Sequence, residues 1–143
     1  CALARRLTAE GRPVLVLTTA AEQRALPRLA AQVGAEPAAR WCTEPLPRLA
    51  ALLSGCAGAV AHDSGLMHVA AARGLRVVAL FGSTSPALGF APAGGGHVVL
   101  CRNEPCQPCT LHGRAACPRR HFRCMLGLDV EAVLAAVAGL AGR

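Results

Sequence analysis

The sequence predicts an α/β protein in which a Rossmann-like parallel sheet is flanked by helices. Short apolar runs bounded by turn-forming residues alternate with helical patterns, which is typical of parallel sheets covered on both faces. Two of these runs, Gly58–His62 and Arg76–Phe81, enclose one helix with short connections, the pattern of a βαβ unit. With 143 residues, 53% of them hydrophobic and 16% charged, the chain has the composition of a folded domain rather than a disordered one.

The first part of the chain predicts helices around short strands. Residues Ala2–Leu7 follow a helical pattern, and the apolar run Val14–Thr18 predicts a buried strand. A second helix is expected over Ala20–Val33, with a break or kink at Pro27 because proline lacks the N–H that the helix needs. A further short strand is expected at Trp41–Thr43.

The second part predicts helices from about Pro47 to Leu53 and over Leu66–Arg73, each before a strand of the βαβ unit. Beyond the βαβ unit, residues 82–128 show little regular pattern. Within this stretch only His97–Leu100 predicts a strand. Such a stretch is unusual in a compact domain unless it is functional or cross-linked. Within it lies a Cys-rich segment, residues 101–125. The chain then predicts an amphipathic helix over Asp129–Leu140, with its first residue as the N-cap.

The most informative turn joins the strand ending at His62 to the helix that follows. Here Asp63, Ser64 and Gly65 precede the helix, and His68 lies one turn in, on the same face as Ser64. Helix N-termini offer free N–H groups and partial positive charge, and ligands of open α/β sheets bind at the carboxyl ends of strands. The turn therefore predicts an anion site. The alternative is that Ser64 only caps the helix and that His68 is a core residue.

Several motifs, taken in order, resemble glycosyltransferase family 9, the heptosyltransferases of lipopolysaccharide inner-core synthesis. The run Ala61–Ala72 resembles the donor-site signature of that family, and Arg76–Pro86 resembles the strand and loop that follow it. The cysteines between Cys106 and Cys124, with Cys117-Pro118, resemble the tail of heptosyltransferase-II-type members. The resemblance covers nearly the whole chain, whereas each motif alone would be weak. His62 departs from the pattern, since the family has Asn there.

This resemblance implies the C-terminal half of a GT-B fold, in which residues 1–143 form one nucleotide-sugar-binding domain. The chain begins at Cys1 in the middle of a helical pattern, so we expect it to be truncated at its N-terminus. The missing N-terminal half, with the first strand and loop of this half, would carry the catalytic base and a basic phosphate contact. No catalytic residue is therefore expected in this chain, and it should be inactive alone. The reaction implied is an inverting transfer of heptose from ADP-heptose to the lipopolysaccharide core, in the cytoplasm or peripheral to the inner membrane, without a cofactor.

The resemblance also implies which residues bind the donor. Asp63 would face the heptose, and the turn and helix after it would hold the diphosphate. The residues after the next strand would line the same cleft. The full set of expected donor contacts is Asp63, Ser64, Gly65, Leu66, His68, Gly82, Ser83 and Thr84.

Four of the eight cysteines have spacings that bear on metal binding: Cys106, Cys109, Cys117 and Cys124. Four thiols within so short a stretch match the ligand count of a structural zinc site, although not its usual paired spacing. Free thiols, an iron–sulfur cluster and disulfides are the alternatives, of which disulfides fit a reducing compartment least.

The charge of the chain leaves a second class of function open. Its net charge is +7, and all 15 basic residues are Arg. A small, basic, zinc-stapled module that binds nucleic acid or protein is therefore an alternative, although three Phe and one Trp offer few surfaces for base stacking. We expect no nucleic-acid partner. A GT-B enzyme that uses another nucleotide sugar is the third possibility, because no residue clearly recognises the base.

Overall fold

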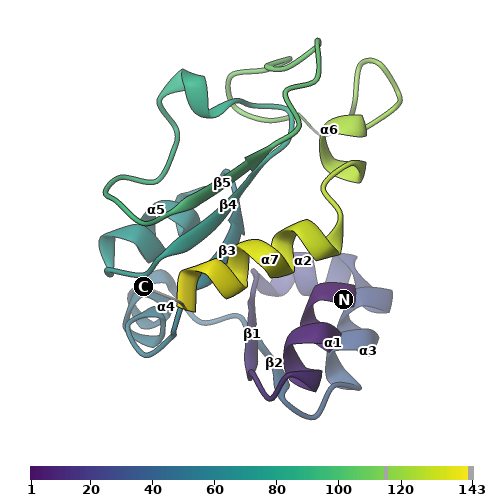
Figure 1. Ribbon diagram of the computed structural model, residues 1–143. Coiled ribbons are helices and arrows are strands. Elements are labelled where there is room, and N and C mark those ends of the chain that lie inside the picture. Colours follow the sequence, from purple (N-terminus) through teal and green to yellow (C-terminus); the bar gives the residue numbers. More distant parts are fainter. Residues whose placement is uncertain (115, 142–143) are drawn as a thin grey trace. The chain divides into compact units, whose positions relative to one another are not determined.

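A computed structural model describes residues 1–114 and 116–141 of the chain (Figure 1). The protein is α/β, with parallel strands flanked by helices, as the sequence predicts. Its contacts divide it into two compact units, Cys1–Leu52 and Leu53–Arg143. The assignment of residues 1–143 to one domain of a longer protein stays a prediction.

The first unit is built on a two-stranded parallel sheet. Strand β1 (Val14–Leu17) pairs with β2 (Ala39–Cys42), and Val14 lies opposite Ala39. Helix α1 (Ala2–Ala9) precedes β1, and α4 (Leu46–Leu53) follows β2 and ends at the first residue of the second unit. Strand β2 begins two residues before the predicted Trp41–Thr43, because its pairing with β1 includes Ala39 and Arg40.

Pro27 breaks the long helix that the pattern predicted over residues 20–33. The structure has α2 (Ala20–Ala25) and α3 (Pro27–Gly34) instead, with Pro27 at the first position of α3. Between them Leu26 has φ −121° and ψ 58°, outside the helical region. Proline both lacks an N–H and disfavours helical backbone at the preceding residue, so the predicted break is confirmed with its cause.

The second unit contains a three-stranded parallel sheet with the order β3–β4–β5. Its strands are β3 (Ala59–His62), β4 (Val77–Phe81) and β5 (Val98–Cys101), and α5 (Gly65–Ala72) connects the first two as the predicted βαβ unit. The central strand β4 supplies much of the core, since Val77, Val78 and Phe81 are fully buried. In Figure 1, β4 lies between the other two strands of this sheet.

The last helix, α7 (Val130–Ala141), packs against β4 and β5. The carboxylate of Asp129 accepts a hydrogen bond from Ala132 N at 2.7 Å, so the predicted N-cap is confirmed. None of the helices in the described ranges is long and apolar enough to cross a bilayer.

Two short elements were not predicted from the sequence, one between β4 and β5 and the other between β5 and α7. These are a 3₁₀ turn, η1 (Pro86–Leu88), and a one-turn helix, α6 (Arg123–Leu126). Neither is long enough to produce a hydrophobic periodicity, which is the signal that the prediction used.

Candidate functional site

The turn between β3 and α5 sits at the carboxyl edge of the second sheet. Asp63 N donates to Leu80 O at 3.2 Å, which extends the parallel pairing of β3 and β4 by one residue. This bond holds Asp63 beside the end of β4, where Gly82, Ser83 and Thr84 follow. Both polar segments singled out by the sequence therefore meet at one edge of the sheet.

Ser64 occupies the N-cap position of α5 but does not cap it. Its backbone is extended (φ −161°, ψ 164°), and its hydroxyl makes no capping hydrogen bond to the described part of the helix. The alternative that Ser64 only caps the helix is therefore wrong. The hydroxyl lies at the solvent-exposed start of α5 instead, where the first N–H groups of a helix lack the partner four residues earlier; Met67 N bonds to Ser64 O at 3.1 Å.

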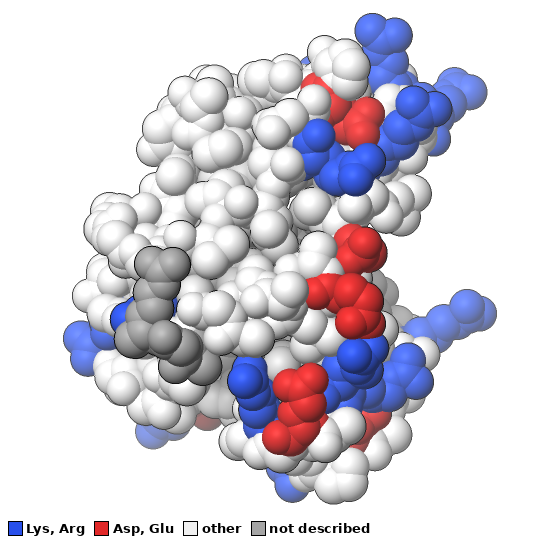
Figure 2. Space-filling view, viewed as in Figure 1, with Lys and Arg blue, Asp and Glu red and all other residues white. Residues whose placement is uncertain are grey.

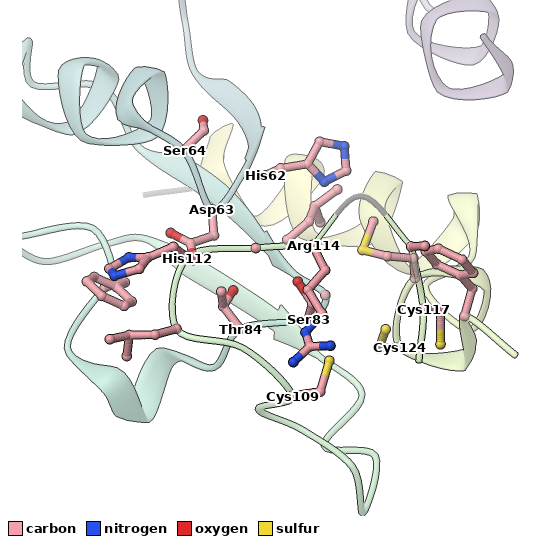
Figure 3. A pocket seen from close by; sticks show the side chains of 18 of the residues that line it. His62, Asp63, Ser64, Ser83, Thr84, Cys109, His112, Arg114, Cys117 and Cys124 are labelled. Carbon is pink, nitrogen blue, oxygen red and sulfur yellow. The ribbon is translucent and has the colours of Figure 1, made fainter. Parts of the chain in front are cut away.

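A pocket of about 460 Å³ opens at this edge of the sheet (Figure 3). Seven of the eight predicted donor contacts line it, and only Leu66 does not: the lining residues from the prediction are Asp63, Ser64, Gly65, His68, Gly82, Ser83 and Thr84. His68 is exposed, which excludes the alternative that it is a core residue. Thr84, in contrast, lines the pocket from a buried position, since it is only 5% exposed.

The Cys-rich segment forms another part of the same pocket, which sequence reasoning missed. Its lining residues are Cys109, Leu111, His112, Gly113, Arg114, Ala116, Cys117, Phe122, Cys124 and Met125. No regular spacing marks these positions, so only the three-dimensional contacts reveal them. Phe90, close to η1, adds a further apolar side chain.

The loop after β4 is bonded to the Cys-rich segment. The side-chain amide of Gln107 donates to the main-chain oxygens of Gly82 and Thr84, and Cys109 N donates to Ser83 O at 2.9 Å. Gly82 is buried, and a Cβ placed on it would lie 2.6 Å from Met125 Sδ. These contacts favour glycine at position 82, and the hydrogen bonds hold the pocket wall that Ser83 and Thr84 form.

The predicted metal ligands do not form a metal site as they stand. Among residues 1–114 and 116–141, no three His, Cys, Asp or Glu side chains are gathered closely enough to hold a metal ion, and the eight cysteines are free. Cys106 Sγ lies 3.9 Å from His121 Nε2. Three of the predicted ligands, Cys109, Cys117 and Cys124, nevertheless line one pocket. Figure 3 shows their side chains among those that surround it.

The pKa values of two of these thiols, Cys117 and Cys124, differ from the ordinary value of a cysteine. A hydrogen bond from the backbone of Phe122, assisted by others from residues 119–121, lowers the pKa of Cys117 below its ordinary value. Burial raises the pKa of Cys124, and the nearby thiols Cys109, Cys117 and Cys106 raise it further. Cys117 is therefore the thiol that becomes a thiolate more readily.

On the face drawn in Figure 2, some of the arginine side chains of each unit lie next to acidic side chains. Such mixed charge differs from the unbroken basic surface that nucleic-acid-binding proteins present.

The model of glycosyltransferase family 9 (heptosyltransferase) matches residues 1–117. Lipopolysaccharide heptosyltransferase 2 of Salmonella typhimurium is 37% identical over 89 residues, which cover 59% of this chain and 25% of that protein. Lipopolysaccharide heptosyltransferase 1 of Pseudomonas aeruginosa is 41% identical over 109 residues, which cover 75% of this chain and 30% of that protein. The chain thus spans a quarter to a third of these relatives.

The crystal structure of a family 9 glycosyltransferase from Veillonella parvula has the same fold. It superimposes with a TM-score of 0.76 and 20% identity, over 98% of this chain and 39% of that one. The fold, the strand-end site and the match of the family model over most of the sequence lead to one conclusion: this chain belongs to glycosyltransferase family 9, the heptosyltransferase family.

Proposed function

We propose that the pocket of the second unit binds the nucleotide-sugar donor of a lipopolysaccharide heptosyltransferase. One observation carries the proposal: two segments that follow neighbouring parallel strands bring seven predicted donor contacts into one pocket. The names of the relatives supply the reaction class. The donor we propose is ADP-heptose, and the acceptor is the inner core of lipopolysaccharide.

The start of α5 would hold the diphosphate. Gly65 is the first residue of this helix, and the space where its Cβ would stand is empty to 4 Å, so a phosphate can approach the backbone closely. The N–H groups of the first turn and the partial positive charge of the helix end suit an anion. The exposed hydroxyl of Ser64 can donate a further hydrogen bond to a phosphate oxygen.

Asp63 would bind the sugar. It is the one carboxylate among the described lining residues, and a carboxylate accepts hydrogen bonds from sugar hydroxyls. In the transfer we propose, an acceptor hydroxyl attacks the anomeric carbon from the side opposite the diphosphate. The C–O bond to ADP then breaks with inversion, and ADP leaves as an anion. The helix end would stabilise the negative charge that develops on the leaving oxygen.

The base that removes the acceptor proton would lie outside this chain. The relatives are much longer, since the aligned regions cover only 25% and 30% of them. We therefore propose that a further part of the same protein supplies the base and the acceptor site, and that these 143 residues alone bind donor without turnover. The setting we propose is the cytoplasm or the periphery of the inner membrane.

Protein-detected NMR titration of the chain with ADP-heptose tests the donor proposal, because it reports weak binding and folding together. We expect shifts at the β3–α5 turn, and a loss of affinity of about tenfold or more in Asp63→Ala from the lost charged hydrogen bonds. Glu44→Gln, on the surface of the first unit, serves as the control.

The competing functions give different outcomes in the same titration. Equal shifts with UDP-glucose would contradict the choice of donor. Shifts with a short DNA duplex, without any from a nucleotide sugar, would favour the nucleic-acid module and overturn the proposal.

A further inference from the structure

Near its start, the Cys-rich segment is hydrogen-bonded to the loop after β4, which forms one wall of the pocket. Gln107 and Cys109 bond to the main chain of residues 82–84, as described above. Past this anchor the chain reverses: Thr110 Oγ1 donates to Gly113 O at 3.1 Å, and His112 N donates to Thr110 Oγ1 at 3.3 Å. Gly113 has φ +90°, a conformation that favours glycine. The reversal is therefore encoded locally.

This reversal carries a cation into the pocket. Arg114 follows Gly113 directly and lines the pocket together with Asp63 and Ser83. Figure 3 shows its guanidinium among the side chains that surround the pocket. In the described ranges, Arg114 is the one arginine of the lining, whereas Arg119 and Arg120 lie outside it.

The charges of the pocket leave a diphosphate only partly neutralised without Arg114. A nucleoside diphosphate sugar carries two negative charges, and the end of α5 offers roughly half a positive charge. Asp63 adds a negative charge to the same lining. A guanidinium presents a planar fork of donors that matches two phosphate oxygens, so Arg114 adds a permanent cation to a described lining whose other basic side chains are histidines.

We propose that the Cys-rich segment is a wall of the donor site and that Arg114 binds the diphosphate of the nucleotide sugar. This inference rests on the proposed function of the same pocket. It gives the segment a role in ligand binding that does not depend on whether its cysteines hold a metal.

The test compares two arginines of the same segment by NMR titration of the full chain with ADP-heptose. Arg114→Gln should raise the Kd about tenfold, since it removes a charge-assisted hydrogen bond. Arg119→Gln, which changes the net charge equally but lies outside the pocket, should change the Kd by less than about twofold. Arg114→Lys should restore part of the loss, because it keeps the charge but not the fork.

A second ligand separates phosphate binding from a structural role. Adenosine has no phosphate, so its shifts and affinity should be the same in Arg114→Gln and in the unchanged chain. Lower affinity for adenosine as well would mean that Arg114 only shapes the pocket, which would overturn the inference.

The remaining outcomes distinguish this inference from the proposed function. If the unchanged chain shows no shift with ADP-heptose, the proposed function fails and the role of Arg114 fails with it. If Asp63→Ala weakens binding but Arg114→Gln behaves like Arg119→Gln, the proposed function stands and only the role of Arg114 is overturned.

Discussion

The side-chain amide of Gln107 donates a hydrogen bond to the main-chain oxygen of Gly82, 25 residues earlier in the sequence. The same nitrogen lies 3.5 Å from Thr84 O, and Gln107 Oε1 accepts from Glu104 N at 2.7 Å. One partly buried amide thus connects the loop after β4 to the start of the Cys-rich segment.

We predict that Gln107→Glu destabilises the chain by about 1–3 kcal/mol, because a carboxylate cannot donate to the two carbonyl oxygens and leaves them without this partner. The matched control is Gln32→Glu, which makes the same chemical change at an exposed position of α3. Urea unfolding measures both. Equal midpoints for the two variants would show that the amide does not hold the loop.

Gly82 and Met125 give a second prediction. Gly82→Ala should cost about 1–2 kcal/mol, because the new methyl group would overlap the Met125 thioether and force it to move. In a Met125→Ala background the same substitution should cost less, and a double-mutant cycle measures this coupling.

Gly34→Ala is the control for Gly82→Ala, since no atom lies within 4 Å of the added Cβ. It should be neutral or slightly stabilising, as expected where alanine fits the backbone. Additive costs at positions 82 and 125 would contradict the steric explanation.

The sequence was sufficient to predict the half of the pocket whose residues directly follow strands β3 and β4. Parallel strands end at one edge of a sheet, so predicting β3 and β4 as neighbours also predicts that Asp63 and Ser83 lie together. The order of strands and helices was predictable for the same reason, because each buried strand and each amphipathic helix has its own periodicity.

The half of the pocket that the Cys-rich segment forms depends on contacts that no periodicity in the sequence indicates. The bond from Gln107 to Gly82 and the approach of Met125 to Gly82 involve single side chains, distant in sequence, in irregular backbone. Arg114 looks in the sequence like any other scattered arginine. The missing cap at Ser64 has a similar origin, since residue type at an N-cap indicates a preference and not the side-chain conformation.

The start of α2 gives a prediction about pH. Glu22 Oε2 accepts hydrogen bonds from Thr19 N at 2.7 Å and Thr19 Oγ1 at 2.8 Å, and Glu22 N donates to Thr19 Oγ1, which completes a capping box. The bond from the Thr19 backbone, and then that from its side chain, lower the pKa of Glu22 in the folded chain.

A carboxyl whose pKa is lowered by folding stabilises the protein above its unfolded pKa, and this stabilisation is lost as pH falls through the folded pKa. Glu22→Gln should therefore lower the Tm at pH 7, and the difference from the unchanged chain should shrink as the pH falls below about 4. Glu44→Gln, which breaks an exposed ion pair with Arg48, is the control. A pH-independent difference for Glu22→Gln would contradict the role of its charge.

The thiols give the last prediction. Because its pKa is lowered, Cys117 should carry more thiolate at neutral pH than Cys124, whose pKa is raised by burial. In the presence of a chelator, iodoacetamide should modify Cys117 first, and its rate should fall at lower pH than the rate of an ordinary thiol. Peptide mapping by mass spectrometry identifies each site, and Cys117→Ser should remove the fast phase.

The same assay without chelator tests the zinc hypothesis. Zinc bound by Cys106, Cys109, Cys117 and Cys124 would require these side chains to draw closer than the structure has them. It would protect all four from alkylation and would be released stoichiometrically on chelation. If the reduced chain, purified with zinc present, contains no metal and Cys117 reacts equally fast with and without chelator, the cysteines are free thiols. The anchoring of this segment then depends on the hydrogen bonds of Gln107 and Cys109 and on the packing of Met125 against Gly82, without a metal.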